Sequence, residues 1–284
     1  MPVAVSRVLL VSPDGMLGRA WSEHLAAKGI ECVGVRYPEF DVTDAARRSA
    51  VDFTKFDAVV NCSGYTDVDG AEADEAAATA VNGDGVGGLA SQCREAGATL
   101  VHYSTDYVFD GTARTPYPID HPRAPVNAYG RSKAAGEMQI EAVGGTHLII
   151  RTSWLYAPWG GNFVKTMARL AAERDTLRVV DDQHGRPTSA EHLAAVSLQL
   201  LQHGASGPMH VTDGGQCSWY ELAAAVAAAV NPACTVEPCT SAEFVRPATR
   251  PPYSVLDLTA TEAIVGPMPP WQDNVADVLP RIET

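Results

Sequence analysis

The chain has 284 residues, of which 46% are apolar and 19% are charged, so it can bury the core of one large domain or of two unequal ones. Its formal net charge of −13, with no block of lysines or arginines, argues against a nucleic-acid surface or an anionic membrane as partner. Six cysteines without a Cys-x-x-Cys spacing, and eight histidines without ligand-like pairing, indicate no zinc cage, redox dithiol or other metal site.

The first half of the chain alternates between apolar runs typical of strands and alanine-rich stretches typical of helices. A buried strand at residues 6–11 leads through a turn at 12–18 into a helix at 19–28, which closes at Gly29. Later strands are expected at 30–35, 56–61, 99–103 and 147–151, and later helices at 72–81, 85–95 and around Tyr129. This alternation predicts an α/β protein with a doubly wound parallel sheet.

The turn at 12–18 has the spacing of a nucleotide-binding loop. Gly15 and Gly18 allow close packing of the helix on the strand, which leaves backbone N–H groups at the helix start free for an anionic pyrophosphate. Ser12 stands where the usual three-glycine pattern has its first glycine, and a simple strand-to-helix turn is the alternative interpretation. The candidate cofactor-binding residues of this loop are Ser12, Gly15, Met16, Leu17 and Gly18.

The residue that follows the second strand often distinguishes the two nicotinamide cofactors. A carboxylate there binds the ribose of NAD, whereas an arginine accommodates the 2′-phosphate of NADP. Arg36 occupies this place and favours NADPH, with NADH as the other cofactor to be considered; a solvated residue at a strand end is the alternative interpretation of Arg36. Asp41 and Val42, in the next turn, are expected to border the adenine.

Beyond Arg151 the alternation weakens, and the chain becomes richer in proline and turn residues, as at 232–238 and 246–252. A helix expected at 191–203 still fits the first lobe. We therefore expect a Rossmann-type NAD(P)-binding domain of residues 1–153 plus about 187–213, and a smaller substrate-binding lobe of about 154–186 plus 214–284.

Tyr129 and Lys133 stand four residues apart, so on a helix they share one face. A nearby ammonium favours phenolate and is expected to lower the tyrosine pKa from its free value of about 10. Thr105, after the strand at 99–103, would offer its hydroxyl to the same oxygen. These three side chains can protonate a carbonyl oxygen during hydride transfer, although a tyrosine and a lysine at this spacing also meet by chance on many helices.

Taken together, several segments resemble the dTDP-4-dehydrorhamnose reductase family, in the extended branch of the short-chain dehydrogenase/reductase superfamily. The resemblance spans nearly the whole chain. The matching segments are residues 12–18, 41–44, 59–72, 104–111, 129–137, 151–156, 161–165, 182–188 and 217–221.

The resemblance implies roles for the residues at matching positions. Tyr129 would donate the proton, Lys133 would hold the nicotinamide ribose and lower the tyrosine pKa, and Thr105 would assist at the carbonyl. Further cofactor contacts would come from Cys62, Ser63, Gly64 and Thr66. Trp154 and Tyr156 would face the sugar, and contacts to the sugar nucleotide would also come from Ser104, Thr105, Asp106 and, at the diphosphate, Asn162, Lys165 and Arg250. Without the family, Trp154 would more often be a core residue.

The triplet Thr105-Asp106-Tyr107 bears on the reaction. Sugar-nucleotide dehydratases of this fold carry Thr-Asp-Glu there, because elimination of water needs an extra acid and base. This chain lacks the glutamate that would take the α-proton of the sugar, which favours simple keto reduction. We therefore expect reduction of the C4 keto group of a dTDP-4-keto-6-deoxyhexose, giving dTDP-L-rhamnose or a close relative, with the sugar itself left open.

A different class of protein shares this resemblance. The β subunit of methionine adenosyltransferase is similar to the same family and acts as a regulatory subunit, so a non-catalytic nucleotide-binding subunit is the alternative. The presence of Thr105, Tyr129 and Lys133 favours the enzyme, because function is argued from the site rather than from the fold.

The start of the chain runs directly into a strand without the pattern of a signal peptide, and no apolar run approaches the roughly 18 residues of a membrane span. We therefore expect a cytoplasmic protein whose partner is a dTDP-sugar, with no nucleic acid or membrane as partner. If the protein forms an assembly, we expect it to be a homodimer. Some family members bridge such a dimer through magnesium and a glutamate of the first helix, but Ala20 stands at that place.

Overall fold

A parallel sheet forms the centre of the protein, in a computed structural model that describes residues 4–283. Its strands lie in the order β10-β5-β4-β3-β1-β2. They are β1 (Arg7–Val11), β2 (Glu31–Val35), β3 (Ala58–Asn61), β4 (Thr99–Thr105), β5 (His147–Thr152) and β10 (Gly207–His210). From β1 the chain continues to β2 on one side and later to β3 on the other, so a topological switch point lies between β1 and β3. Ligands of open α/β sheets bind outside the carboxyl ends of the strands at such a point. The predicted fold class is confirmed.

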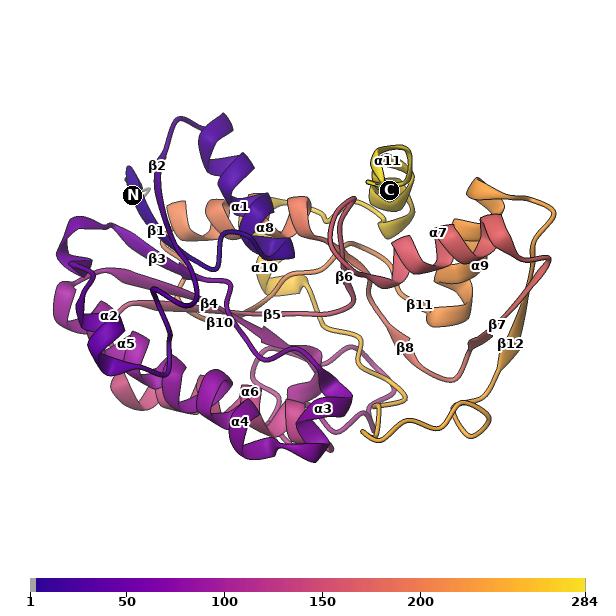
Figure 1. Ribbon diagram of the computed structural model, residues 1–284, viewed down its shortest axis with the longest axis horizontal. Coiled ribbons are helices and arrows are strands. Elements are labelled where there is room, and N and C mark those ends of the chain that lie inside the picture. The colour runs from indigo at the N-terminus through magenta and orange to yellow at the C-terminus, as the bar shows by residue number, and fades with distance from the viewer. Residues whose placement is uncertain (1–3, 284) are drawn as a thin grey trace.

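Helices cover both faces of the sheet (Figure 1). One face carries α1 (Met16–Ala27) and α8 (Ala190–Gln202), which pack against each other, and α10 (Thr259–Val265) packs against α8 and β10. The other face carries α5 (Gly85–Ala96) and α6 (Ala128–Val143), with the shorter α2 (Ala45–Ser49), α3 (Val68–Ala73) and α4 (Glu75–Thr79) beside them. No helix among residues 4–283 has both the length and the apolar character needed to cross a bilayer.

The single helix predicted at residues 72–81 is wrong. The chain there forms α3 and α4, then a π-helical turn at Ala80–Asp84 that leads into α5. Asp74 separates the first two helices because its side chain accepts a hydrogen bond from the backbone of Ala77 and so caps α4. Within the π-helical turn, the buried Asn82 amide donates to the carbonyl of Tyr65 and to the Ser132 hydroxyl, both at 2.9 Å.

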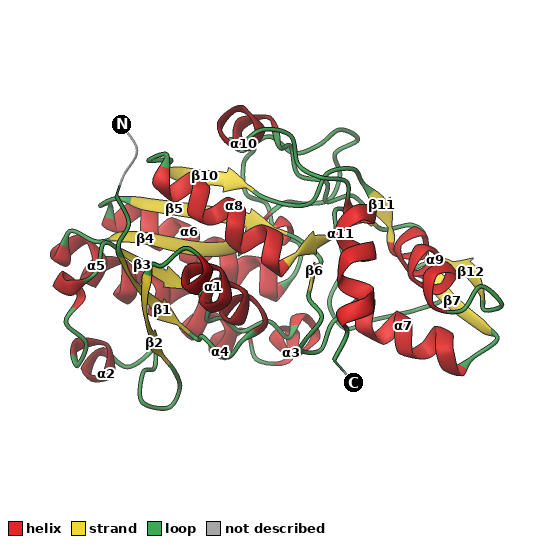
Figure 2. Ribbon diagram, turned by 90° about the horizontal axis from the view of Figure 1, so that it is seen from above, coloured by secondary structure: helices red, strands yellow, loops and turns green. Residues whose placement is uncertain are grey.

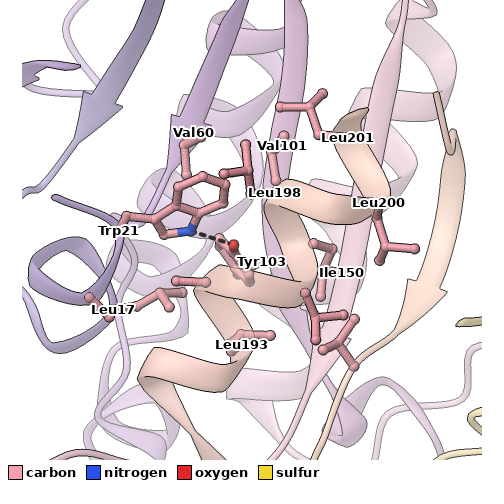
Figure 3. Packing of buried hydrophobic residues seen from close by; sticks show 14 of the residues in the cluster. Leu17, Trp21, Val60, Val101, Tyr103, Ile150, Leu193, Leu198, Leu200 and Leu201 are labelled. Atoms are coloured by element: carbon pink, nitrogen blue, oxygen red, sulfur yellow. Dashed lines mark hydrogen bonds between the residues drawn. The ribbon is translucent and has the colours of Figure 1, made fainter. Parts of the chain in front are cut away.

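The main core lies between the sheet and the pair α1 and α8. Figure 3 shows Trp21 of α1 and Tyr103 of β4 meeting there among leucines of α8, with the Trp21 Nε1 donating to the Tyr103 hydroxyl at 2.6 Å. Burial of a large apolar side chain contributes about 1.5–3 kcal/mol, so this layer fixes β4 firmly against the helices. Since Tyr103 lies near the carboxyl end of β4, the same packing positions the residues that follow it.

A buried ion pair joins α6 to β5. The Arg151 guanidinium donates to both carboxylate oxygens of Glu137, at 2.9 and 2.7 Å, and the two side chains are 3% and 0% exposed. Arg123 adds a hydrogen bond of 3.0 Å to Glu137 and a fork to the more exposed Glu141. Burial raises the pKa of Glu137, but the hydrogen bonds and charge of Arg151, together with hydrogen bonds from Ser104 and Arg123, outweigh it, and the pKa lies below its usual value. Glu137 is therefore a buried carboxylate whose charge is compensated.

The second half of the chain builds a smaller lobe at one end of the sheet (Figure 2). Its core lies between α7 (Phe163–Glu173), α9 (Trp219–Val230) and α11 (Trp271–Val278), with the parallel pair β7 (Thr176–Val180) and β12 (Thr235–Cys239). Two further pairs of short strands are formed: β6 (Leu155–Tyr156) pairs with β9 (Thr188–Ser189), and β8 (His184–Gly185) with β11 (Cys217–Ser218). The domain boundaries given above stay a prediction.

Candidate active site

A cavity of about 530 Å³ opens at the carboxyl ends of the strands, between the sheet and the smaller lobe. It brings together four segments that are distant in the sequence. They are the glycine loop with Ser12, Gly15, Met16 and Leu17; the end of β3 with Cys62, Ser63, Gly64 and Thr66; the end of β4 with Ser104, Thr105 and Asp106; and Tyr129 with Lys133 of α6. Trp154 lines the wall toward the smaller lobe. Most residues predicted for the site therefore share one cavity.

The glycine loop packs tightly under the start of α1. A Cβ atom on Gly18 would stand 2.0 Å from the carbonyl oxygen of Ser12, so only glycine allows this approach. Ser12 itself has a φ of 64°, the left-handed conformation for which the usual pattern has glycine. No side chain caps α1 at Gly15, and the first backbone N–H groups of a helix have no partner within it. This loop therefore suits a pyrophosphate despite the serine.

A second cavity of about 340 Å³ adjoins the first and shares Ser12, Ser63 and Gly64 with it. Asp41 and Val42 line this cavity, as expected for residues near an adenine. The remaining lining residues are Val11, Val35, Tyr37, Phe40, Thr43 and Val81. Together the two cavities offer a long crevice across the switch point, and its residues fit a dinucleotide that extends from this end to Tyr129.

Tyr129 and Lys133 lie in the first turns of α6. The helix begins after Asn127, whose side-chain oxygen accepts a hydrogen bond of 2.7 Å from the backbone of Gly130. Tyr129 is half-buried in the cavity wall, whereas Lys133 is only 6% exposed and donates from Nζ to the carbonyl of Tyr103 at 2.5 Å. The predicted spacing of four residues thus places both side chains at the cavity.

The expected effect of Lys133 on the tyrosine pKa is contradicted. Burial, together with the charge of Asp106, raises the pKa of Tyr129 to about 12, and the Thr105 hydroxyl opposes this shift only partly. Burial also lowers the pKa of Lys133 to about 8. The lysine ammonium donates to the Tyr103 carbonyl, and burial and Asp106, rather than the lysine charge, set the pKa of Tyr129. Tyr129 is consequently a neutral phenol at pH 7, which is the form able to donate a proton.

Thr105 and Asp106 form a hydrogen-bonded pair at the end of β4. The Thr105 hydroxyl donates to Asp106 Oδ1 at 2.9 Å, while the other carboxylate oxygen of Asp106 is buried without a partner. Burial raises the pKa of Asp106 to about 6. The neighbouring Ser104 also lines the cavity and is buried.

Two aromatic residues line the cavity although their roles were not predicted. Trp219 stacks on Trp154 with ring centres 3.7 Å apart, and Trp154 adopts a left-handed φ of 47°. Tyr107 meets the ring of Tyr129 edge-on at 6.1 Å. The signal for Trp219 lay in the matching segment at 217–221, but only the fold shows that the start of α9 reaches the cavity.

Four predicted substrate contacts do not line this cavity. Tyr156 is 1% exposed and donates its hydroxyl to the buried Asp213 at 2.8 Å. Asn162 caps α7 by accepting from the backbone of Lys165, and Lys165 donates from Nζ to the carbonyl of Glu283 at 2.6 Å. The placement of these three residues gives no support to a role at the sugar or the diphosphate.

Arg250, the fourth, lies between β12 and α10, in a segment that is tied to α3 of the sheet domain. Its guanidinium forms a fork with Asp69 of α3, in which Nη2 donates to Oδ2 at 2.9 Å. Beside it, the amide of Asn127 donates to the carbonyl of Thr249 at 2.8 Å. This segment therefore reaches the residue that caps the Tyr129 helix. Arg36, predicted at the cofactor phosphate, is exposed and pairs with Asp14 at 3.3 Å.

Comparison with known proteins agrees with this geometry. The family model of the RmlD substrate binding domain matches residues 6–284. The chain is 42% identical to a dTDP-4-dehydrorhamnose reductase of Streptomyces griseus, over 99% of this chain and 95% of that protein. It is 39% identical to a dTDP-4-keto-6-deoxy-D-glucose reductase of Streptomyces niveus, over 97% of each. The crystal structure of dTDP-4-dehydrorhamnose reductase from Bacillus anthracis in complex with NADP, 34% identical, superposes with a TM-score of 0.92 over 97% of this chain and 99% of that one. The chain belongs to the dTDP-4-dehydrorhamnose reductase family of the short-chain dehydrogenase/reductase superfamily.

Proposed function

We propose that the protein uses NADPH, or less effectively NADH, to reduce the C4 keto group of a dTDP-4-keto-6-deoxyhexose, giving dTDP-L-rhamnose or a close relative. The observation that carries this proposal is the convergence of Thr105, Tyr129 and Lys133 on one cavity that also contains the glycine loop. The names of the relatives point to the same substrate class.

The residues at the cavity account for the proton side of the reaction. Reduced nicotinamide, when bound, supplies the hydride that reaches the carbonyl carbon. Tyr129 donates its phenolic proton to the carbonyl oxygen, and its pKa of about 12 keeps that proton in place at neutral pH. Because an alkoxide is a stronger base than a phenolate, the transfer is favourable. Thr105 lies beside the phenol, and by turning its one hydroxyl proton away from Asp106 Oδ1 it can donate a second hydrogen bond to the developing charge, a contribution of roughly 3 kcal/mol for one such donor.

Lys133 has the features of a residue that holds the cofactor ribose. Its pKa of about 8 keeps it charged at neutral pH, and one of its three N–H groups is bound to the carbonyl of Tyr103. The other two are available to hydroxyl groups in the cavity. Its proposed role is therefore to fix the cofactor beside Tyr129 and to neutralise the phenolate left after proton transfer.

Tyr107 supports reduction rather than dehydration. It lines the cavity next to Tyr129, at the place where the dehydratases have their glutamate. Burial raises the pKa of Tyr107 above its usual value, so it is a neutral phenol that cannot remove an α-proton at physiological pH. The alternative of a non-catalytic regulatory subunit finds no support in a cavity where the reducing apparatus is complete.

The deciding experiment follows NADPH absorbance with a panel of dTDP-4-keto-6-deoxy sugars and identifies the product stereochemistry. For Tyr129→Phe we expect turnover to fall at least about 100-fold while the dissociation constant for NADPH changes less than about two-fold. Tyr220→Phe removes a phenol that lies outside the cavity and serves as the control, with turnover unchanged. Full turnover in Tyr129→Phe, or no NADPH oxidation with any member of the panel, would overturn the proposal.

A cytoplasmic location and a homodimeric assembly complete the proposal. Both substrates are anionic nucleotides, and the cavity that would bind them is built within one chain. Sedimentation of the purified protein measures the assembly, and fractionation of cells measures the location.

A further inference from the structure

An ion pair joins the glycine loop to the end of β2, next in the chain to residues that line the second cavity, such as Val35 and Tyr37. The Nε atom of Arg36 is 3.3 Å from a carboxylate oxygen of Asp14, and the two side chains are 58% and 66% exposed. Asp14 precedes Gly15 in the loop, and Arg36 directly follows β2. The residue expected to bind a phosphate is thus already paired with an acid.

Other cations of this region are also engaged. Arg47 pairs with Asp44 at 3.4 Å, and the Arg48 guanidinium donates to the carbonyl of Val42. Asp41 brings a further carboxyl group to the lining of the cavity. A ligand that extends from this cavity toward Arg36 therefore meets one arginine whose charge is offset by Asp14.

We propose that Asp14 is a specificity residue that lowers the preference of the protein for NADPH over NADH. This inference rests on the proposed function and concerns its cofactor. The 2′-phosphate is the only chemical difference between the two cofactors, and an arginine after the second strand is the group that accommodates it. A guanidinium binds phosphate through the same fork of N–H donors that binds a carboxylate, so Asp14 competes for Arg36.

The exposure of the pair explains why this competition is partial. Exposed ion pairs contribute little to stability, so a phosphate can displace Asp14 from Arg36. The displaced carboxylate then stays close to a group of charge about −1.5 to −2 and repels it. NADH lacks that group, whereas the pyrophosphate is common to both cofactors and meets the charge of Asp14 equally in both, so the ratio of the two affinities isolates the effect on the 2′-phosphate.

The test measures dissociation constants for NADPH and NADH, from nicotinamide fluorescence, in the absence of any sugar. For Asp14→Ser we expect NADPH to bind about five-fold more tightly at low salt, an advantage that high salt reduces, whereas NADH changes less than about two-fold. Arg36→Ala should weaken NADPH binding about ten-fold and leave the dissociation constant for NADH unchanged. Glu39→Gln removes another exposed acidic charge, three residues beyond Arg36, and should change either constant less than about two-fold.

Several results would overturn the role of Asp14. If NADPH binds more weakly to Asp14→Ser, the carboxylate orients Arg36 for the phosphate instead of competing with it. Equal changes for both cofactors would show an effect on the shape of the loop or on the pyrophosphate that both cofactors carry, and an equal gain in Glu39→Gln would show an effect of net charge. Because no sugar is present, a failure to reduce any keto sugar would count against the proposed function alone and leave the binding ratio to decide about Asp14.

Discussion

Replacing Glu137 by glutamine should destabilise the protein strongly. The change leaves the size of the side chain nearly constant but removes the one carboxylate among residues 4–283 that is bound by Arg151, which is 3% exposed. Removal of one partner of a buried ion pair typically costs about 3–5 kcal/mol, because the remaining charge is left uncompensated. At roughly 2–4 °C per kcal/mol for a chain of this size, the melting temperature should fall by roughly 6–20 °C.

The pH dependence of this effect has a definite sign. The pKa of Glu137 in the folded protein lies below its usual value, so its stabilising contribution is fully present above the unfolded pKa of about 4.3. The contribution is lost as the pH falls through the folded pKa. The difference in free energy of unfolding between the wild type and Glu137→Gln should therefore be largest near pH 7 and decrease in acid, as measured by urea denaturation at several pH values.

Two further variants make the measurement decisive. Glu141→Gln is the same chemical change one turn along α6, where the carboxylate is 40% exposed and pairs with Arg123, and should cost less than about 1 kcal/mol. In Glu137→Gln/Arg151→Met the unpaired charge is gone, and part of the lost stability should return. If Glu137→Gln lowers the free energy of unfolding no more than Glu141→Gln does, the buried pair does not hold α6 to β5.

Two predictions concern the cavity. Because the pKa of Asp106 is about 6, kcat/KM should decrease as the pH drops below about 6, and Asp106→Asn should abolish this decrease. The same substitution should lower the pKa of Tyr129, because the Asp106 charge helps to raise it. An unchanged decrease of kcat/KM in acid for Asp106→Asn would contradict this role. Trp219→Leu should raise the KM for the sugar nucleotide about ten-fold, by loss of the stack with Trp154, and leave the NADPH dissociation constant unchanged. Equal losses for both ligands would instead indicate general damage to the lobe.

The parallel α/β class of the fold and the meeting of Thr105, Tyr129 and Lys133 at one cavity could be predicted because local patterns determine them. A spacing of four residues places Tyr129 and Lys133 on one helix face in any fold, and the carboxyl ends of parallel strands meet at one edge. β10 escaped prediction because Gly207-Pro-Met-His210 has no β-branched residue, and it becomes a strand only through pairing with β5.

Other properties depend on contacts between distant segments. The pKa of Tyr129 could not be read from its distance in sequence to Lys133, because burial dominates it and the ammonium is bound to the carbonyl of Tyr103. Tyr156 follows the strand end as a sugar-facing residue would, yet its hydroxyl is bound to Asp213, which lies 57 residues later. Such partners are fixed only by the tertiary fold.

The amide of Asn127 has a consequence for engineering. Its oxygen caps the helix of Tyr129, and its nitrogen holds the carbonyl of Thr249 in the smaller lobe. Because the acceptor is a main-chain carbonyl, chimaeras that exchange the carboxyl-terminal part of the chain in order to alter sugar choice keep this link only where the graft follows the same backbone path at Thr249. Grafts of that kind should include the turn around Thr249 in its native backbone path, or they will trade turnover for the new selectivity.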